Sequence, residues 1–385
     1  MTTTARDSVT VPNGLGRDRL PLSHPMHRIR RVGQPTTKIT EDVSRFDERE
    51  HGFLRALRGD FGPVPQREFQ RFVDKYPLSG AMMGVEHHLA AAVDGPVAKD
   101  RAPLPDDPLV LSRHIKQVAM FMRSDDVGIC ELPPYAVYSH DKNGDAVELA
   151  HTHAIAVLVD QGSWTFEAAS GRDWISNCQS FRSYTATALI SSMLAEYIRR
   201  LGYSARAHHS MDYKVVVPPI LMMAGLGEIC RIGGTVIHPF LGPRFKAAVV
   251  TTDLPLQPDK PIDFGLQAFC SVCKKCAREC PSGSITEGPK TLYNGYEIWR
   301  NDIESCARFR VTNAQGSSCG RCIKVCPWNK PATWYHNVAV GLSARSGLAR
   351  RGLVWLDEAL GYGKENPSRK WWFDMEQIDD HLIPR

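Results

Sequence analysis

Long hydrophobic runs are absent from this 385-residue sequence. The most apolar stretch, residues 215–226, is too short to cross a bilayer and is interrupted by Pro218 and Pro219, which indicates buried core. An Arg30-Arg31 pair is not followed by the apolar segment that a secretory or twin-arginine leader would carry. We therefore expect a protein of the reducing cytoplasm with no membrane contact.

A strong charge of either sign is also missing. The formal net charge is +5, and charged residues make up 23% of the chain. Such a mild basic excess is weak evidence for a polyanionic partner, so we expect no nucleic-acid partner. Hydrophobic residues, at 43%, are sufficient for a large core in two or three domains.

Cysteine is scarce over most of the chain but concentrated towards its end. Of eleven cysteines, only Cys130, Cys178 and Cys230 lie outside a block of eight between residues 270 and 326. Clustering of this kind indicates ligation of a metal or cluster rather than disulfide bonding.

The cysteine block contains two related motifs. The first is C-x2-C-x2-C-x3-C-P and ends at Pro281, a spacing in which three thiolates bind one [4Fe-4S] cluster while the fourth reaches a second cluster. In the second motif, one cysteine precedes a C-x2-C-x3-C-P run that ends at Pro327. Two four-cysteine zinc sites are the alternative, because they also use x2 spacings. The crossing rule assigns one cluster to Cys270, Cys273, Cys276 and Cys326, and the other to Cys280, Cys306, Cys319 and Cys322.

Four regions are predicted along the chain. They are an N-terminal arm and helical region (1–110), a layered α/β (α+β) domain (111–260), a ferredoxin-like two-cluster domain (261–335) and a C-terminal segment that packs on the body (336–385). In the second region, β-branched runs at 154–159 and 247–251 predict strands. Apolar periodicity predicts a helix from about residue 185 to 201, with Ser183 as its cap and Gly202 at its end.

A series of short runs surrounds the first cysteines. They are AGLGE at 224–228, GPR at 242–244, TDLPL at 252–256, DKPID at 259–263 and NGYEIW at 294–299. Together with the cysteine block, they resemble the corrinoid-dependent reductive dehalogenases, over roughly residues 120–330 and in the cytoplasmic, catabolic type. The resemblance implies that region 111–260 is a nitroreductase-like domain that binds a base-off cobalamin. It also implies removal of halogen from an organohalide.

The resemblance assigns roles to four further residues. Tyr184 matches the family's proton donor, and Lys246 matches its basic partner, whose ammonium group would stabilise the phenolate. Ser180 and Arg310 match substrate contacts in members that act on halogenated phenols or aromatic acids, and the planar fork of Arg310 suits an anionic substrate. Without the resemblance, Tyr184 would be a half-buried aromatic residue, Lys246 a solvated strand residue and Arg310 a surface residue that tunes a cluster.

The resemblance also implies an electron path and its partners. Electrons would pass through the two clusters to Co(I), which engages the halogen. Because the sequence ends soon after the cysteine block, we expect a separate reductase or ferredoxin as electron donor. One alternative is an epoxyqueuosine reductase, which the CPWN run at 326–329 also resembles and which would need a carboxylate proton donor and a basic tRNA-binding face. Another is a non-catalytic electron carrier, which would not need a large domain before its clusters.

Overall fold

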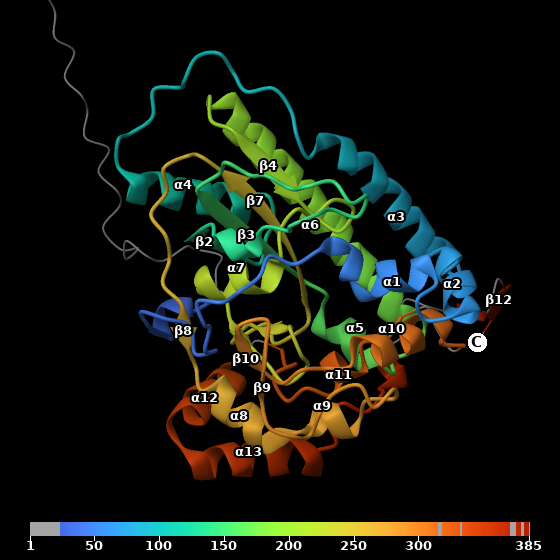
Figure 1. The fold of residues 1–385 in the computed structure, drawn as a ribbon. Helices are drawn as coiled ribbons and strands as arrows, with labels where there is room; N and C mark the ends of the chain where they lie inside the picture. Colours follow the sequence, from blue (N-terminus) through green and yellow to red (C-terminus); the bar gives the residue numbers. More distant parts are fainter. Residues whose placement is uncertain (1–23, 315–317, 332, 370–374, 379–380, 385) are drawn as a thin grey trace, which may run out of the picture.

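The computed structural model describes residues 24–314, 318–331, 333–369, 375–378 and 381–384. The first part of the predicted N-terminal arm, residues 1–23, lies outside the described residues. The centre of the described structure is a four-stranded antiparallel sheet in the order β2-β3-β7-β4 (Figure 1). Its strands are β2 (Asp126–Glu131), β3 (His153–Asp160), β4 (Ala205–His208) and β7 (Phe245–Thr252).

The two predicted strands are confirmed as β3 and β7, which pair in the register Val157↔Ala248. Ile155 and Val157 join one core cluster, while Ala156 and Leu158 join another on the opposite face. Because both faces of β3 are covered, its sequence is a continuous apolar run instead of an alternating one. The mixed α/β fold class is therefore as expected.

The long helix α6 (Trp174–Arg200) covers one face of this sheet together with α4 (Pro108–Phe121). Gly202, in the left-handed region at φ 86°, follows the helix end, as predicted. The predicted start near residue 185 is wrong, because the helix begins eleven residues earlier, after its N-cap Asp173. The opposite face is covered by α7 (Val217–Met223), which lies within the apolar stretch at 215–226.

The N-terminal part of the chain packs on α6 and on the cysteine-rich part. Helix α3 (Pro77–Leu89) runs along α6 in Figure 1, and α1 (Gly52–Arg58) and α2 (Pro63–Gln70) lie against α10 (Ile303–Thr312). Strand β1 (Arg30–Arg31) pairs with β8 (Ile262–Asp263), so the arm is joined to the beginning of the cysteine-rich region.

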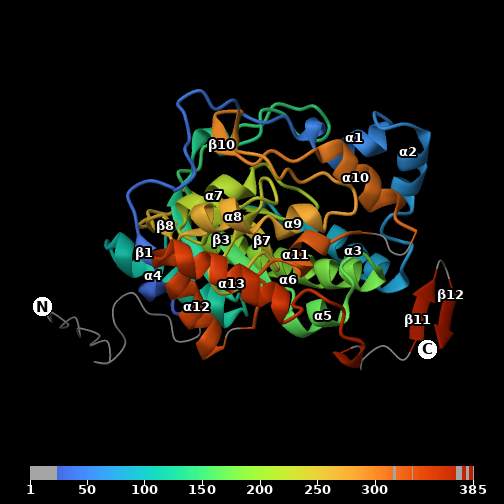
Figure 2. The ribbon, with the colours of Figure 1, turned by 90° about the horizontal axis from the view of Figure 1, so that it is seen from below.

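The cysteine-rich region is covered by the C-terminal helices. Helices α12 (Trp334–Arg345) and α13 (Gly347–Ala359) lie side by side and pack on α8 (Leu266–Cys273), as Figure 2 shows from below. Buried Asp357 on α13 forms ion pairs with Lys275, inside the first cysteine motif, and with Lys330, which follows the second. The C-terminal segment thus shields one side of the predicted cluster sites.

The remaining described elements are short. They are α5 (Ser163–Ala168), α9 (Lys275–Arg278), α11 (Arg321–Lys324), β5 (Glu228–Ile229), β6 (Val236–Ile237), β9 (Thr291–Tyr293), β10 (Tyr296–Ile298), β11 (Met375–Ile378) and β12 (His381–Pro384), with 3-10 turns at Met26–Arg28, Glu48–Glu50, Ala90–Ala92, Pro134–Ala136 and Pro367–Arg369. Among the described residues, no helix is both long and apolar enough to span a bilayer.

Candidate active site and cluster sites

Helix α6 carries two of the four predicted site residues, Ser180 and Tyr184, one turn apart. Ser183 lies inside the helix and does not cap it, since its Oγ donates to the carbonyl oxygen of Asp160 at 3.2 Å. The first half of α6 buries Ile175, Cys178 and Phe181, which explains why the helix extends towards its N-terminus. Tyr184 is therefore a mid-helix residue with a fixed backbone and not a helix-start residue.

Tyr184 and Lys246 are brought together by the packing of α6 on β7. Lys246 pairs with Val159 in the sheet, and its Nζ lies 4.4 Å from the centroid of the Tyr184 ring. The ammonium group thus sits over the ring face, in cation–π geometry. The structure thus brings two of the four predicted site residues into contact.

Ser180 and Arg310, the other two predicted residues, lie on α6 and α10 respectively. The Ser180 hydroxyl donates to Gln161 Oε1 at 3.2 Å, or to the carbonyl oxygen of Ser176 at 3.0 Å. Arg310 lies on α10, which meets α6 through the packing of Val311 against Phe181. Among the described residues, no direct contact joins Arg310 to the other three predicted residues.

The Arg310 guanidinium is held by an aromatic face and has spare donors. Its Cζ lies 4.3 Å from the centroid of the Phe53 ring, and one terminal nitrogen donates to Ser318 Oγ at 3.5 Å. Its Nε is buried without a hydrogen-bond partner in the described structure. Such an unpaired charged donor is suited to binding an anion.

Sequence analysis missed three polar residues near the pair, namely buried Glu86 and half-buried Ser210 and Tyr213. Glu86 on α3 accepts a short hydrogen bond from Ser210, and the Tyr213 hydroxyl donates to the carbonyl oxygen of Ala247 at 2.7 Å. Burial raises the pKa of Glu86 to about 8, against the opposing effect of the Lys246 charge. No local motif marks these residues, because they meet only when α3 and the loop after β4 pack together.

Four of the block's cysteines gather around a small cavity beside α8. Burial, followed by the proximity of Cys276 and then Cys270, raises the pKa of the Cys326 thiol well above its usual range. Burial likewise raises the pKa of Cys276 to about 12, and the nearby Cys273 thiol raises it further. The structure thus brings together one predicted ligand set. The cavity is lined by Cys270, Cys273, Cys276 and Cys326 and by a fifth cysteine, Cys230.

The other four cysteines form a neighbouring group. Burial and the nearby thiols of Cys319 and Cys306 raise the pKa of Cys322 well above its usual range, and Cys276 of the first group is also close. Cys280 is the exception, because hydrogen bonds with Ser282 and Ser284 outweigh burial and lower its pKa. The second predicted set, Cys280, Cys306, Cys319 and Cys322, is thus also brought together.

The thiols of each group are spread out and do not converge on one point. Among the described residues, no three His, Cys, Asp or Glu side chains lie close enough to share a single metal ion. A four-iron cluster holds its thiolates at four separate corners of a cube, so the two groups are compatible with clusters.

A clamp joins the sheet to the second cysteine motif. Arg244, at the start of β7, is paired with Asp160 at the end of β3, and it also donates to the Lys330 carbonyl oxygen and to Asn329 Oδ1. Gly242 has φ 64°, and a Cβ there would lie 2.2 Å from the carbonyl oxygen of Trp328. This close approach explains the Gly-Pro-Arg run and fixes β7 relative to the clusters.

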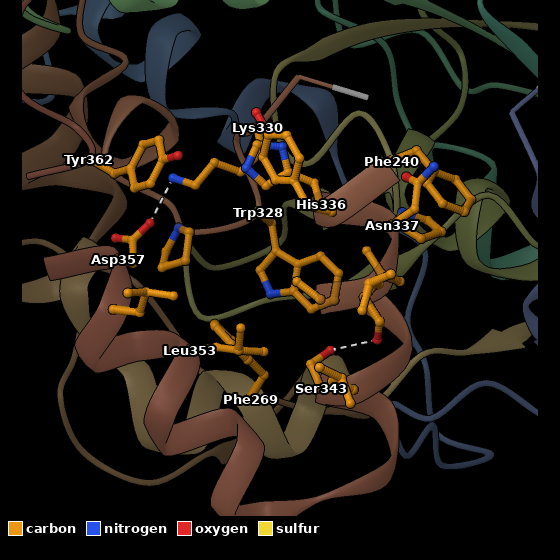
Figure 3. Close-up of a pocket in the computed structure, with 18 of the residues that line it drawn as sticks. Phe240, Phe269, Trp328, Lys330, His336, Asn337, Ser343, Leu353, Asp357 and Tyr362 are labelled. Atoms are coloured by element: carbon orange, nitrogen blue, oxygen red, sulfur yellow. Dashed lines mark hydrogen bonds and ion pairs between the residues drawn. The ribbon is translucent and has the colours of Figure 1, made fainter. Parts of the chain in front are cut away.

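A well-formed apolar pocket lies under the C-terminal helices and contains none of the predicted site residues. Its volume is about 280 Å³, and Phe240, Phe269, Trp328 and Leu353 form its walls, with the Lys330–Asp357 ion pair at one end (Figure 3). This volume is below the roughly 300–1,000 Å³ of pockets that hold drug-sized ligands.

Buried polar atoms without partners allow a test of whether a corrinoid fits the chain. Asn177 Nδ2 and Gln179 Oε1, on the part of α6 that leads to Tyr184, have no hydrogen-bond partner in the described structure, and neither has Trp328 Nε1 beside the cysteines. Such atoms commonly mark a missing ligand, ion or water. A corrinoid carries amide side chains around its ring, which can both donate to and accept from these atoms, so the residues fit it.

Comparison with known proteins first defines the class. Residues 269–329 match the family model described as a 4Fe-4S double cluster binding domain. The chain is therefore an iron–sulfur protein with a double-cluster domain, and zinc is disfavoured as the ligand of these cysteines. Tetrachloroethene reductive dehalogenases of Sulfurospirillum multivorans (37% identical over 49% of this chain and 38% of the relative) and Desulfitobacterium hafniense (39% over 51% and 37%) are among its curated relatives.

Solved structures extend the similarity to nearly the whole chain. The catabolic reductive dehalogenase NpRdhA, in complex with 3-bromo-4-hydroxybenzoic acid, is 43% identical with a TM-score of 0.90, over 94% of this chain and 53% of that one. Another solved structure, of a reductive dehalogenase described as suggesting a mechanism for B12-dependent dehalogenation, is 42% identical to this chain, with a TM-score of 0.89. Over 94% of its length, the chain is thus similar in sequence and fold to reductive dehalogenases.

Two further findings limit what this similarity shows about the whole protein. The chain spans about half the length of the solved relatives and less than two-fifths of the first curated ones. An epoxyqueuosine reductase of Leadbetterella byssophila is also similar, at 32% identity over 28% of this chain and 34% of the relative. That sequence match covers a smaller part of the chain than the matches to the reductive dehalogenases.

Proposed function

We propose that the protein catalyses cobalamin-dependent reductive dehalogenation of an organohalide, with a halogenated phenol or aromatic acid as its substrate. The observation that carries the proposal is the contact between Lys246 and Tyr184 in a chain that also gathers two sets of four cysteines. The proposal is supported by the 43% identity with NpRdhA, which was solved with a brominated hydroxybenzoic acid.

The chain's own residues would supply the proton and its electrostatic control. In the overall reaction, the organohalide takes two electrons and one proton and releases halide, leaving hydrogen on carbon. Tyr184 donates that proton, and the phenolate that remains is stabilised by the Lys246 ammonium group over its ring. Ser180, one turn away on α6, offers a hydroxyl to a polar group on the substrate.

Arg310 would orient the substrate by binding the substrate's negatively charged group. Its buried Nε lacks a partner among the described residues, and its stacking on Phe53 limits the directions in which the fork can point. A carboxylate or phenolate oxygen can take that donor in a charge-assisted hydrogen bond. This supports an aromatic acid or phenol over a neutral chloroalkene.

The corrinoid and the two clusters would supply the remaining steps of the reaction. When bound, the corrinoid supplies the cobalt centre that receives electrons and cleaves the carbon–halogen bond. Asn177, Gln179 and Trp328 would hold its polar edges, and the two thiol groups would hold the clusters.

We also propose a reductase or ferredoxin as electron donor, in a reducing compartment such as the cytoplasm. The groove that borders Cys273 is lined by Lys275, Arg278, Arg321 and Lys364, so a partner could approach that thiol closely. Cluster thiolates also need to remain reduced until iron binds, which a cytoplasmic location permits.

The proposal is tested by halide release. Protein reconstituted without oxygen with iron, sulfide and cobalamin, and supplied with a chemical reductant, should release bromide from 3-bromo-4-hydroxybenzoate. Cobalt and iron contents should be measured on the same sample. Full cofactor content without halide release, or turnover of epoxyqueuosine in tRNA instead, would show that the proposed function is wrong.

A further inference from the structure

Glu86 is a buried carboxyl group whose surroundings do not explain it as a purely structural residue. It has no exposed surface, and its Oε2 lacks a hydrogen-bond partner in the described structure, while Oε1 is bound by Ser210. Leaving a buried acceptor unsatisfied costs roughly 1–3 kcal/mol, and more if the group is charged. A glutamine would accept the Ser210 hydrogen bond equally well, so the acid itself requires a reason.

The position of Glu86 relates it to the predicted proton donor. Helix α3 contacts α6 beside Tyr184, where Thr185 Oγ1 donates to the carbonyl oxygen of Met82 at 3.4 Å, one turn before Glu86. On the other side, Glu86 lies within electrostatic reach of Lys246 on β7. It therefore lies behind the pair, on the side formed by α3.

Tyr213 connects these groups. Its hydroxyl donates to the carbonyl oxygen of Ala247, the residue after Lys246. Burial raises the pKa of Tyr213, and the nearby Tyr184 and Glu86 raise it further. Buried Glu86 and the half-buried side chains of Tyr184, Lys246 and Tyr213 thus gather from α3, α6, β7 and the loop after β4. Only two of them, Tyr184 and Lys246, follow from the family resemblance.

We propose that Glu86 is a positioning residue that stores a proton behind the Tyr184–Lys246 pair and returns it to the pair after each turnover. This inference rests on the proposed function. After Tyr184 has given its proton to carbon, the phenolate takes one from the Lys246 ammonium group. Neutral Lys246 then takes one from the Glu86 carboxylic acid through a bridging water, because no direct hydrogen bond joins these two side chains in the described structure. Solvent then reprotonates Glu86, so one proton enters for each one that leaves with the product.

The charge of Glu86 is compatible with this task. Burial raises its pKa to about 8, and Lys246 lowers it less strongly, so the acid is protonated in neutral solution and can still ionise. The titratable groups within electrostatic reach of Glu86 are Lys246 from β7 and Tyr213 from the loop after β4, and Tyr213 is in turn close to Tyr184 from α6. His209 is the first residue of the same loop, and it lies near Leu89 of α3.

The first test reads the proton directly. In the infrared spectrum of the reconstituted protein, the carbonyl stretch of a buried carboxylic acid should be present at pH 7 and should decline as the pH rises through about 8. Glu86→Gln should remove it. Glu228→Gln is the matched control, because Glu228 is equally buried but receives hydrogen bonds from the backbone of Phe264 and from Gln267, far from Tyr184 in the sequence and on another element.

The second test reads the pH profile of turnover. We expect kcat of the wild type to fall above about pH 8, whereas Glu86→Gln should be at least about tenfold slower at pH 7 and lack that limb. Glu86→Asp should restore part of the rate, and Glu228→Gln should keep the wild-type profile. An unchanged profile in Glu86→Gln, or an ionised Glu86 at pH 7, overturns the inference. If the wild type itself releases no halide, the proposed function fails, while the infrared result still decides whether Glu86 holds the proton.

Discussion

The eight cysteines of the predicted cluster sites lie between residues 270 and 326, whereas the groups around Tyr184 come from α1, α3, α6, β7 and α10. Most of the cysteine positions are fixed by covalent spacing within two short motifs. The reaction site exists only when distant elements pack together, as Phe181 and Val311 do. We therefore expect all-or-none losses when a cysteine is changed and graded losses when the reaction site is changed.

The largest expected effect concerns the cysteines. The intact protein should bind about eight irons in two four-iron clusters, and Cys280→Ala or Cys306→Ala should reduce the iron content to about four. Turnover should then be lost, because one step of the electron path is missing. Iron and sulfide analysis with EPR measures both. Cys230→Ala is the matched control, because this buried thiol lines the first cavity but belongs to neither motif.

Retention of about eight irons in Cys306→Ala, or equal loss of both clusters in every variant, would show that the ligand sets are assigned wrongly. Loss of iron in Cys230→Ala would add a ninth thiol to the sites.

Next in size is the loss expected at Tyr184. Tyr184→Phe keeps the ring under Lys246 but removes the proton, so turnover should slow by about a hundredfold or more while iron and cobalt contents stay unchanged. Lys246→Ala should impair the same step. The double variant should be little slower than the worse single one, because the two residues act as a unit. Losses that multiply would contradict a coupled pair, and a fully active Tyr184→Phe would contradict the site itself.

A smaller effect is expected at Arg310. Arg310→Lys keeps the charge but loses the planar fork and the stacking on Phe53, so the KM for an acidic substrate should rise by roughly tenfold, with kcat changed less. A halogenated benzene without an acidic group serves as the matched control substrate. An equal rise of KM for both compounds would exclude a role in anion recognition.

The smallest expected effect concerns stability. Burial raises the pKa of Glu86 in the folded protein to about 8, from an ordinary value near 4.5, so wild-type stability should fall as the pH rises from about 4.5 to 8. Glu86→Gln is neutral throughout. Its Tm relative to the wild type should therefore increase by a few degrees between pH 5 and pH 9. A difference that does not change with pH, measured by calorimetry with cofactor contents matched, would show that Glu86 titrates normally.

The comparison also explains what the sequence could predict. Cysteine spacing and the runs of β3 and β7 are local patterns, so the cluster ligands and both strands were accessible without a structure. Tyr184, Lys246, Ser180 and Arg310 came only from resemblance. Their roles remain predictions, although the structure brings Tyr184 and Lys246 into contact.

Other features could not be predicted because they depend on tertiary packing. The start of α6 was missed because its first ten residues mix aromatic and polar side chains, several of which become buried only against other elements. Glu86 lies in a helix with no polar periodicity to single it out. Its hydrogen bond with Ser210 depends on a loop that follows more than a hundred residues later. The division of the chain into domains at residues 110, 260 and 335 likewise stays a prediction.

The pairing of β1 with β8 has a consequence for how the protein is made. Arg30 and Asp263, which are joined by an ion pair, are separated by 233 positions in the sequence. During synthesis, Arg30 leaves the ribosome long before its partner strand exists, so the arm has to wait unpaired while the sheet forms. Contacts of such large sequence separation form late and slow folding. The arm would thus close over the molecule only when the junction that leads into the first cysteine motif has emerged.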